Sequence, residues 1–194
     1  MDLSALAFAG LSALAWLHSK NPVVLADLTK NMGQGVSNAV GQVFGRTLTE
    51  AQVRNLAQST VSTYFPRVDP NMLVAMASIE SSFRADAIRY EPQVDDGSTG
   101  LMQTLVGTAH WLWEQMGARA FGEPTPQSLL DPAQSMYFGA AYVNWLRTYG
   151  GKARSEEWIV RAYNGGPGWE GRAGAVTQTA NHWAKYQAAR GRFG

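Results

Sequence analysis

The sequence contains no cysteine, and this absence excludes several classes of site at once. A chain without thiols has no disulfide framework, no thiol nucleophile, no iron–sulfur cluster and none of the zinc sites that use cysteine ligands. Histidine is scarce too, because His18, His110 and His182 are far apart along the chain. A metal centre built from several histidines is therefore not expected, and we predict neither a metal nor an organic cofactor.

Charge is also sparse. Only 16% of the residues are charged, compared with ~25% in an average soluble protein. The 16 basic and 15 acidic side chains leave a net charge of +1. A chain with this balance has no overall attraction to a polyanion, so we predict no nucleic-acid partner. Apolar residues are plentiful, since 45% of the residues are hydrophobic and 11% aromatic, which is enough to form a sizeable core.

The first residues form an apolar run. Residues 3–17 carry no charge, but the run is shorter than the ~20 residues that a membrane span needs. No Lys or Arg precedes it, whereas a secretory signal begins with positive charge. Ala5, Ala9 and Ala13 recur every four residues, so a helix here would have one flat side for close packing. We predict a helix that contacts a membrane or a partner subunit, with an atypical export signal or an ordinary core helix as alternatives.

A boundary follows this run. Residues 31–46 are rich in glycine and small polar residues, which is typical of a linker. Thr47 and Glu50 then have the spacing of a capping box at the start of a helix. We therefore divide the chain into an N-terminal segment, 1–46, and a main domain, 47–194.

The main domain is predicted to be mostly helical. Asp69 and Asp131 each precede a proline, and Ser155 precedes two glutamates, which are N-terminal helix signals. Together with the hydrophobic periodicity, they predict helices beginning near residues 47, 70, 105, 132, 156 and 178. Only residues 87–103 look non-helical for any length. The expected fold class is mainly α, with a short irregular or β region between the second and third helices of the domain.

The second of these helices carries an acid on its apolar face. Leu73, Met76, Glu80 and Phe83 share one stripe, so Glu80 faces the core. A buried carboxyl group without a partner costs several kcal/mol if it is ionised, so it either finds a partner or keeps its proton. A protonated carboxylic acid is suited to general acid catalysis. The alternative is that Glu80 pairs with Arg84, one turn later, and only stabilises the helix.

Three short blocks then point to a family. They are E-S-S-F at Glu80–Phe83, S-T-G-L-M-Q at Ser98–Gln103 and R-A-Y-N-G-G at Arg161–Gly166. In this order the blocks resemble the soluble lytic transglycosylase domain of the lysozyme-like superfamily, from residue 70 to the last helix. The resemblance implies an α+β lysozyme-like fold. It also implies an enzyme without cofactors that cleaves peptidoglycan between N-acetylmuramic acid and N-acetylglucosamine and forms a 1,6-anhydro product without water.

The resemblance implies roles for the matching residues. Glu80 matches the catalytic acid and base of a family that has no carboxylate nucleophile, because the N-acetyl group of the substrate supplies the oxygen that holds the cationic sugar carbon before the muramoyl 6-hydroxyl attacks it. Most glycosidases use two carboxylates instead. Gln103 matches an amide that contacts the muramoyl sugar, the alternative being a helix-capping glutamine. Tyr163 matches a tyrosine near the catalytic acid, the alternative being a residue that only anchors the core. Asn164 matches an amide that stabilises the cleft. Two further candidates for substrate binding are Ser98 and Leu105.

The chain departs from the family in its last helix. The family commonly has a tyrosine there, with an acid four residues before it. His182 and Gln178 occupy these places here, and Tyr186 is one turn later. We count both His182 and Tyr186 as candidates for contact with substrate, and which of them reaches the cleft is open at this stage.

A second departure is the acidic pair Asp95 and Asp96 before the G-L-M-Q motif. Goose-type lysozymes, which share the fold, have acids in this region that can position a water molecule. A lysozyme-like hydrolase is therefore the alternative enzyme, although D-D-G-S is also an ordinary turn signal. The alternative from another class is a non-catalytic wall-binding or structural module.

The expected partner is the glycan strand of peptidoglycan, so the protein would act at the cell wall, in the periplasm or outside the cell. The N-terminus lacks a convincing export signal. One hypothesis is that a phage particle or another assembly delivers the protein, with residues 3–17 docked on a membrane or a virion subunit. The alternative is a bacterial wall-remodelling enzyme with an unusual leader.

Overall fold

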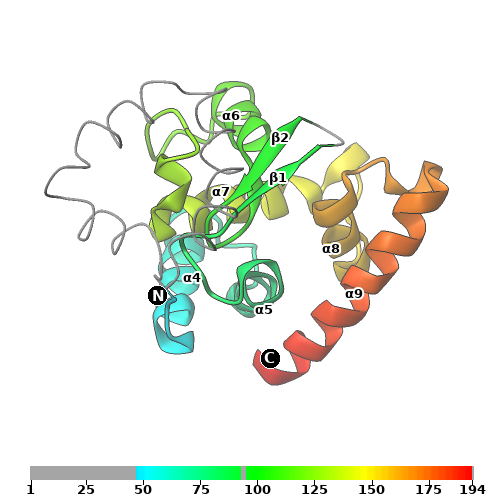
Figure 1. Cartoon of the computed structure of the whole chain (residues 1–194), viewed down its shortest axis with the longest axis horizontal. Helices are drawn as coiled ribbons and strands as arrows, with labels where there is room; N and C mark the ends of the chain where they lie inside the picture. Colours follow the sequence, from blue (N-terminus) through cyan, green and yellow to red (C-terminus); the bar gives the residue numbers. More distant parts are fainter. Residues whose placement is uncertain (1–46, 93–94, 194) are drawn as a thin grey trace, which may run out of the picture.

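A computed structural model describes residues 47–92 and 95–193 (Figure 1). Its elements are α4 (Glu50–Tyr64), α5 (Pro70–Ser81), β1 (Ile88–Glu91), β2 (Asp96–Thr99), β3 (Thr104–Leu105), α6 (Val106–Glu114), α7 (Pro132–Leu146), α8 (Glu156–Gly165) and α9 (Ala173–Phe193), with 3-10 turns at Ser128–Leu130, Tyr149–Gly151 and Trp169–Gly171. The predicted architecture, mainly α with a short β region between the second and third of these helices, is confirmed.

Two predicted features, the apolar run 3–17 and the linker 31–46, lie outside the described residues. The division of the chain at residue 46 accordingly stays a prediction. None of the helices in the described ranges combines the length and the apolar character that crossing a membrane requires.

The predicted N-terminal signals begin three of the helices. The side chain of Asp69 accepts a hydrogen bond from the backbone N–H of Asn71, and Asp131 caps α7 in the same way. Ser155 accepts one from the backbone N–H of Trp158 at the start of α8. Each side chain satisfies a donor that the first helical turn leaves unpaired.

The capping box of α4 differs from the prediction by two residues. Thr49 is the N-cap, and Thr49 and Gln52 bond each other's backbone N–H groups reciprocally. Thr47, the predicted cap, instead forms an isolated β-bridge with Arg84. Thr47 and Thr49 both have a Glu or Gln three residues later, so the spacing rule alone cannot identify the N-cap. The β-bridge of Thr47 with a distant segment leaves Thr49 as the cap.

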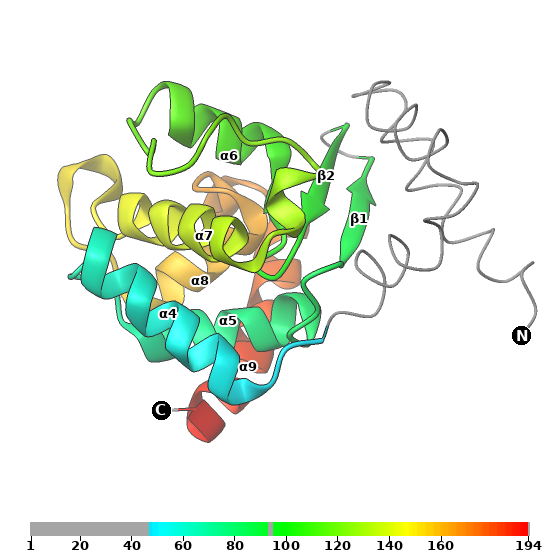
Figure 2. The same cartoon turned by 90° about the vertical axis from the view of Figure 1, so that its left-hand side faces the viewer.

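Helix α7 forms the centre of the core. It packs against α4, α5, α6 and α8, and Figure 2 shows it between α6 on one side and the pair α4 and α5 on the other. Its side chains are buried on nearly every side, including Met136, Phe138, Val143 and Leu146. A helix that is apolar all round is stable only in such a central place.

The three strands form an antiparallel sheet in the order β1-β2-β3. Ile88 pairs with Thr99, and Ser98 pairs with Leu105. Gly100 makes the turn after β2 with φ +78°, and its backbone passes so close to the loop before α7 that a Cβ there would lie 2.0 Å from the carbonyl oxygen of Leu129. This close approach brings the G-L-M-Q segment down onto the core.

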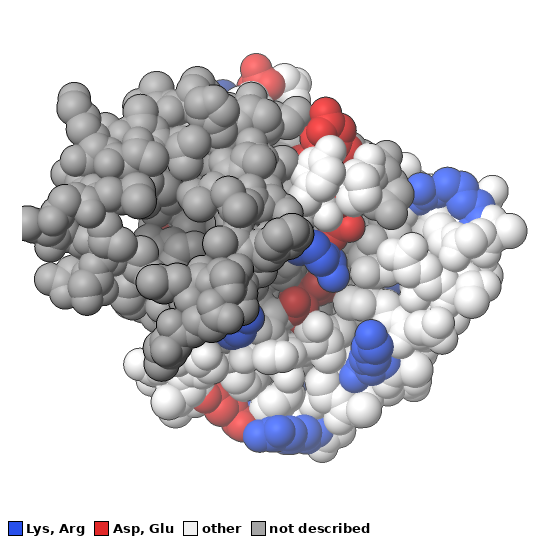
Figure 3. Space-filling model, viewed as in Figure 1, with Lys and Arg blue, Asp and Glu red and all other residues white. Residues whose placement is uncertain are grey.

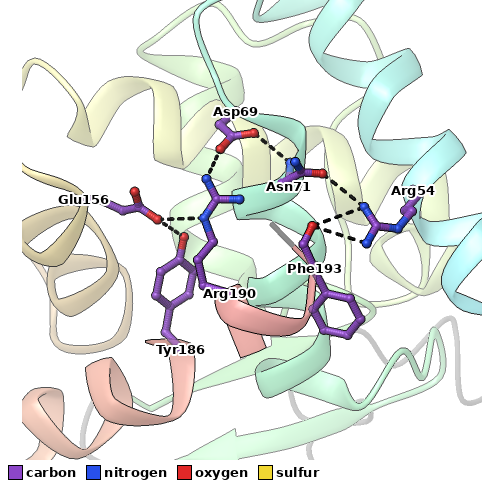
Figure 4. Close-up of polar contacts among 7 residues, drawn as sticks. All are labelled: Arg54, Asp69, Asn71, Glu156, Tyr186, Arg190 and Phe193. Carbon is purple, nitrogen blue, oxygen red and sulfur yellow. Dashed lines mark hydrogen bonds and ion pairs between the residues drawn. The ribbon is translucent and has the colours of Figure 1, made fainter. Parts of the chain in front are cut away.

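Helix α9 packs along both α5 and α8, and polar contacts hold its second half in place (Figure 4). The hydroxyl of Tyr186 donates to Glu156 of α8. Arg190 contacts Glu156 and also Asp69, the N-cap of α5. The guanidinium of Arg54 on α4 donates to the carbonyl oxygen of Phe193 at 3.2 Å. Residues of α4 and α8 and the N-cap of α5 therefore hold the second half of α9 in place.

This helix begins at Ala173, five residues before the predicted start near residue 178. Gly174 and Val176 are poor helix formers, which is why the pattern indicated a later start. Arg161 of α8 donates to the carbonyl oxygen of Val176 at 3.0 Å and to the hydroxyl of Thr179 at 3.2 Å. These contacts with α8 stabilise a first turn that its own residues do not favour.

Candidate active site

A cavity of about 720 Å³ lies between the sheet, the C-terminal ends of α5 and α8 and the start of α9. Six of the eight predicted site residues line this cavity: Glu80, Ser98, Gln103, Leu105, Tyr163 and Asn164. The exceptions are His182, which contacts Glu80, and Tyr186. Segments that are far apart in the sequence thus meet at one place.

Glu80 lies in the last turn of α5, and only 7% of its side chain is exposed. Its Oε1 atom is 3.2 Å from Nε2 of His182, whose side chain is 11% exposed. Arg84, the alternative partner in the sequence interpretation, contacts Asp86 instead, at 3.3 Å. Glu80 is therefore a nearly buried carboxyl group that borders a cavity and has no arginine partner among the described residues.

The residues after Glu80 explain why the helix ends there. Ser81 donates its hydroxyl hydrogen bond to the carbonyl oxygen of Leu101 at 2.8 Å, which ties α5 to the G-L-M-Q segment. Ser82 and Phe83 then take positive φ values of 54° and 64°, which break the helix. The E-S-S-F block thus places the acid at a helix end and fastens that end to the opposite wall of the cavity.

Tyr163 brings its hydroxyl group close to this acid. The hydroxyl donates to the carbonyl oxygen of Met102 at 2.9 Å and lies 3.1 Å from Oγ1 of Thr104. Burial, and after it the negative charge of Glu80, raises the pKa of Tyr163 well above its usual value. The hydroxyl accordingly stays protonated and remains a neutral polar group beside Glu80.

The raised pKa values of the buried tyrosines should make the free energy of unfolding depend on pH in alkaline solution. Burial raises the pKa of Tyr142, which lies beside Tyr163, to about 12. Above pH ~10 the unfolded chain loses these phenolic protons while the folded protein keeps them, so the free energy of unfolding should fall by up to ~1.4 kcal/mol per pH unit for each tyrosine. Urea unfolding between about pH 9 and pH 12 measures this slope. Tyr142→Phe should reduce the slope, and a slope equal to that of the wild type would contradict the assignment.

Gln103 has a structural as well as a lining role. Its Nε2 atom donates to the carbonyl oxygens of Ala87 and Gly100, both at 2.9 Å, and its φ is +48°. The side chain therefore holds the turn that follows β2, and it does not cap a helix in the way the alternative interpretation expected. It still lines the cavity.

The other predicted wall residues are held by polar partners. Oδ1 of Asn164 accepts a hydrogen bond from Gln178 at 3.3 Å, which links α8 to α9 across the cavity. Ser98 donates to Glu91 at 3.0 Å. Leu105 adds an apolar edge at the start of α6.

His182 and Tyr186 lie one turn apart on α9 and have different surroundings. His182 is the one that contacts the carboxylate of Glu80. Tyr186 is fully buried, and its hydroxyl contacts Glu156 at the N-terminal end of α8, whereas the cavity is lined by the C-terminal end of that helix. The structure therefore brings His182, and not Tyr186, to the acid.

The acidic pair lies in the hairpin and not in this cavity. Asp95 accepts a hydrogen bond from the hydroxyl of Tyr90 at 2.8 Å. Asp96 accepts from the backbone N–H groups of Gly97 and Gly107, at 2.7 and 2.8 Å. Neither residue lines this cavity, although Asp96 lines the smaller hollow beside it. Their contacts are those of a turn, as in the alternative interpretation of D-D-G-S.

Sequence reasoning missed three charged residues of the cavity wall: Arg89, Glu91 and Arg172. Arg89 and Glu91 alternate along β1 and form an ion pair at 2.6 Å. Their spacing of two is the period of a strand face, a signal that was available but weak in so short a strand. Arg172 donates to the carbonyl oxygen of Gly165, a contact that only the fold reveals.

A smaller hollow of about 340 Å³ adjoins the main cavity. The two share Thr108, Tyr142 and Pro167, and the smaller one adds Trp111 and Trp145. Aromatic rings with a polar edge are suited to contact with sugar rings. Together the two hollows form a continuous depression.

Charge and metal-binding groups complete the description. On the face in Figure 3, basic and acidic side chains of the described residues occur singly or in small groups. No cluster of three or more His, Cys, Asp or Glu side chains that could hold a metal ion occurs in ranges 47–92 and 95–193. The chemistry that the site can support with its own residues is proton transfer by Glu80.

Comparison with known proteins matches the chain to a family and to solved structures. The chain matches the transglycosylase SLT domain family over residues 60–186. The 70 kDa soluble lytic transglycosylase of Escherichia coli aligns with 71% of this chain at 23% identity and a TM-score of 0.48. The aligned part is 21% of that enzyme, so the present chain corresponds to about a fifth of its length.

Proposed function

Because the chain belongs to the transglycosylase SLT domain family, we propose that it is a lytic transglycosylase. Its substrate is the glycan strand of peptidoglycan, cleaved at the β-1,4 bond between N-acetylmuramic acid and N-acetylglucosamine. The observation that carries this proposal is the nearly buried carboxyl group of Glu80 at the edge of a cavity that also contains Gln103, Tyr163 and Asn164. No cofactor takes part in the proposed reaction.

Glu80 acts twice in this mechanism. It first donates its proton to the glycosidic oxygen, and the bond between that oxygen and the muramoyl C1 breaks. The acetamido oxygen of the same sugar bonds to C1 and holds the cationic carbon. The Glu80 carboxylate then takes the proton of the 6-hydroxyl group, whose oxygen attacks C1 and displaces the acetamido oxygen. The product has a 1,6-anhydro end, and no water is consumed.

The cavity wall supports the binding of such a strand. The amides of Gln103 and Asn164 offer acetamido and hydroxyl groups a polar edge. Arg89 and Arg172 supply positive charge, which suits the carboxylates of the lactyl and peptide substituents on the muramoyl sugars. The hollow with Trp111 and Trp145 extends the same path.

A second candidate function is hydrolysis, because one other carboxylate lines the cavity. Glu91 accepts a hydrogen bond from Ser98 and pairs with Arg89. Glycosidases that invert configuration use a second carboxylate to activate water. Glu91 shares the main cavity with Glu80, whereas both oxygens of Asp96, in the adjoining hollow, accept backbone hydrogen bonds. If this chain is a muramidase, Glu91 is therefore the residue that would activate the water. The ion pair with Arg89 favours transglycosylation, because a Glu91 carboxylate that is paired with a guanidinium is a weaker base for activating water.

Digestion of purified sacculi distinguishes the two reactions. We expect fragments that are lighter by one water than the hydrolysis products, as measured by mass spectrometry. We expect the same anhydro ends from Glu91→Gln, because Glu91 takes no part in the transglycosylase mechanism. Normal reducing ends that disappear in Glu91→Gln would instead identify a hydrolase, and the absence of fragments from the wild type would favour a non-catalytic module.

The substrate determines the proposed place of action, which is the cell wall outside the cytoplasm. Delivery by a phage particle, or docking of residues 3–17 on a membrane or a virion subunit, is a proposal that rests on the sequence pattern alone.

A further inference from the structure

The candidate acid contacts a residue to which the proposed mechanism assigns no role. Nε2 of His182 on α9 lies 3.2 Å from Oε1 of Glu80 on α5, and both side chains are almost fully buried. The family commonly has a tyrosine at this place, so the histidine is a departure of this chain. A buried imidazole against a buried carboxyl group requires an explanation.

The contact has the distance of an ion pair but not the direction of a hydrogen bond. Nε2 has no aligned hydrogen-bond partner among the described residues. A buried nitrogen in this state is unfavourable unless its neighbour can complete the bond. In enzymes without substrate, catalytic hydrogen bonds are often poorly aligned and tighten when substrate binds. A small rotation of either side chain would align Nε2 with Oε1.

The fold holds both members of this pair. His182, Tyr186 and Arg190 follow one another at intervals of four, so they form one stripe of α9. Arg190 reaches Asp69, the N-cap of α5, and His182 reaches Glu80 in the last turn of the same helix. Tyr186 between them is anchored to Glu156 (Figure 4). The stripe thus fixes α9 against both ends of the helix that carries the acid.

We propose that His182 is a positioning residue for Glu80. Its imidazole holds Oε1, which leaves Oε2 to face the glycosidic oxygen. When the carboxyl group has given up its proton, an N–H at Nε2 donates to Oε1 and keeps the carboxylate oriented to take the proton of the 6-hydroxyl group. The inference rests on the proposed function, because it assigns a task within that reaction.

Two replacements of His182 test the orientation. His182→Phe keeps a ring of similar size but removes the nitrogen, and kcat should fall by ~100-fold while KM changes by less than ~3-fold, because orientation and not binding is lost. His182→Gln keeps an N–H donor and should recover most of the lost kcat. Unchanged kcat in His182→Phe, or equal losses in the two variants at equal melting temperature, would overturn the proposal.

A measurement without turnover separates this inference from the proposed function. We expect the ring ¹⁵N signals of His182 to shift in Glu80→Gln, while those of His110, which contacts Glu114 and Glu123, serve as the unchanged reference. If the wild type cleaves no glycan but the His182 signals respond, the proposed function fails and the pairing stands. If glycan is cleaved and the His182 signals do not respond, the positioning role is wrong.

Discussion

Glu80→Gln should reduce the cleavage of peptidoglycan by at least ~1,000-fold. The substitution keeps the shape of the side chain but removes the group that gives one proton and takes another in the mechanism. General acid–base catalysis contributes ~100- to 10,000-fold per proton transfer, and here one group serves both steps. Release of soluble fragments from purified sacculi measures the rate. Binding of sacculi should persist, because the other residues of the cavity wall are unchanged.

Glu170→Gln is the matched control for this variant, because Glu170 is an exposed acid in the 3-10 turn before α9. It makes the same change of charge away from the cavity and should leave the rate unaltered. The thermal stability of Glu80→Gln should not fall, since a nearly buried carboxyl group is replaced by a neutral amide of the same size. A Glu80→Gln protein that still cleaved at more than a tenth of the wild-type rate would remove Glu80 from the mechanism.

Gly100→Ala should lower the free energy of unfolding by roughly 2 to 5 kcal/mol, the sum of two penalties. The first is the positive φ of +78°, and the second is the clash of the new Cβ, 2.0 Å from the carbonyl oxygen of Leu129 and 2.8 Å from Oγ of Ser135. Backbone atoms cannot move aside as a flexible side chain can, so the turn before Gln103 must shift. Urea unfolding measures the loss, and cleavage should fall with it because the same turn bears on the cavity wall.

Gly117→Ala measures the first penalty alone, so the difference between the two variants gives the second. Gly117 has a similar φ of +72°, but no atom lies within 4 Å of a Cβ built there. Its replacement should cost only the conformational strain of ~1 to 2 kcal/mol. Equal losses in the two variants would mean that the close approach of Gly100 to Leu129 does not constrain the fold.

The local signals of the sequence predicted much of the fold. An Asp or Ser cap is satisfied by the backbone N–H groups that follow it directly, so Asp69, Asp131 and Ser155 marked helix starts without knowledge of the rest of the chain. The three motif blocks likewise placed Glu80, Gln103 and Tyr163 around one cavity. In both cases the information is contained within a few consecutive residues.

What the sequence did not reveal depends on contacts between distant segments. The early start of α9 requires Arg161 of α8. The choice between His182 and Tyr186 depends on the rotation of α9, which contacts with Asp69 and Glu156 determine. The short strand β1 presents Glu91 to the cavity, although the sequence directed attention to Asp95 and Asp96.

The pairing of α5 with α9 also relates activity to the order of folding. Glu80 is synthesised early in the domain and His182 late, and contacts of such high sequence separation form slowly because a long loop must close first. A nascent chain that has released α5 but not α9 from the ribosome contains the acid without the imidazole that orients it. If the proposed function is right, full cleavage activity arises when α9 has docked, in one of the last steps of folding.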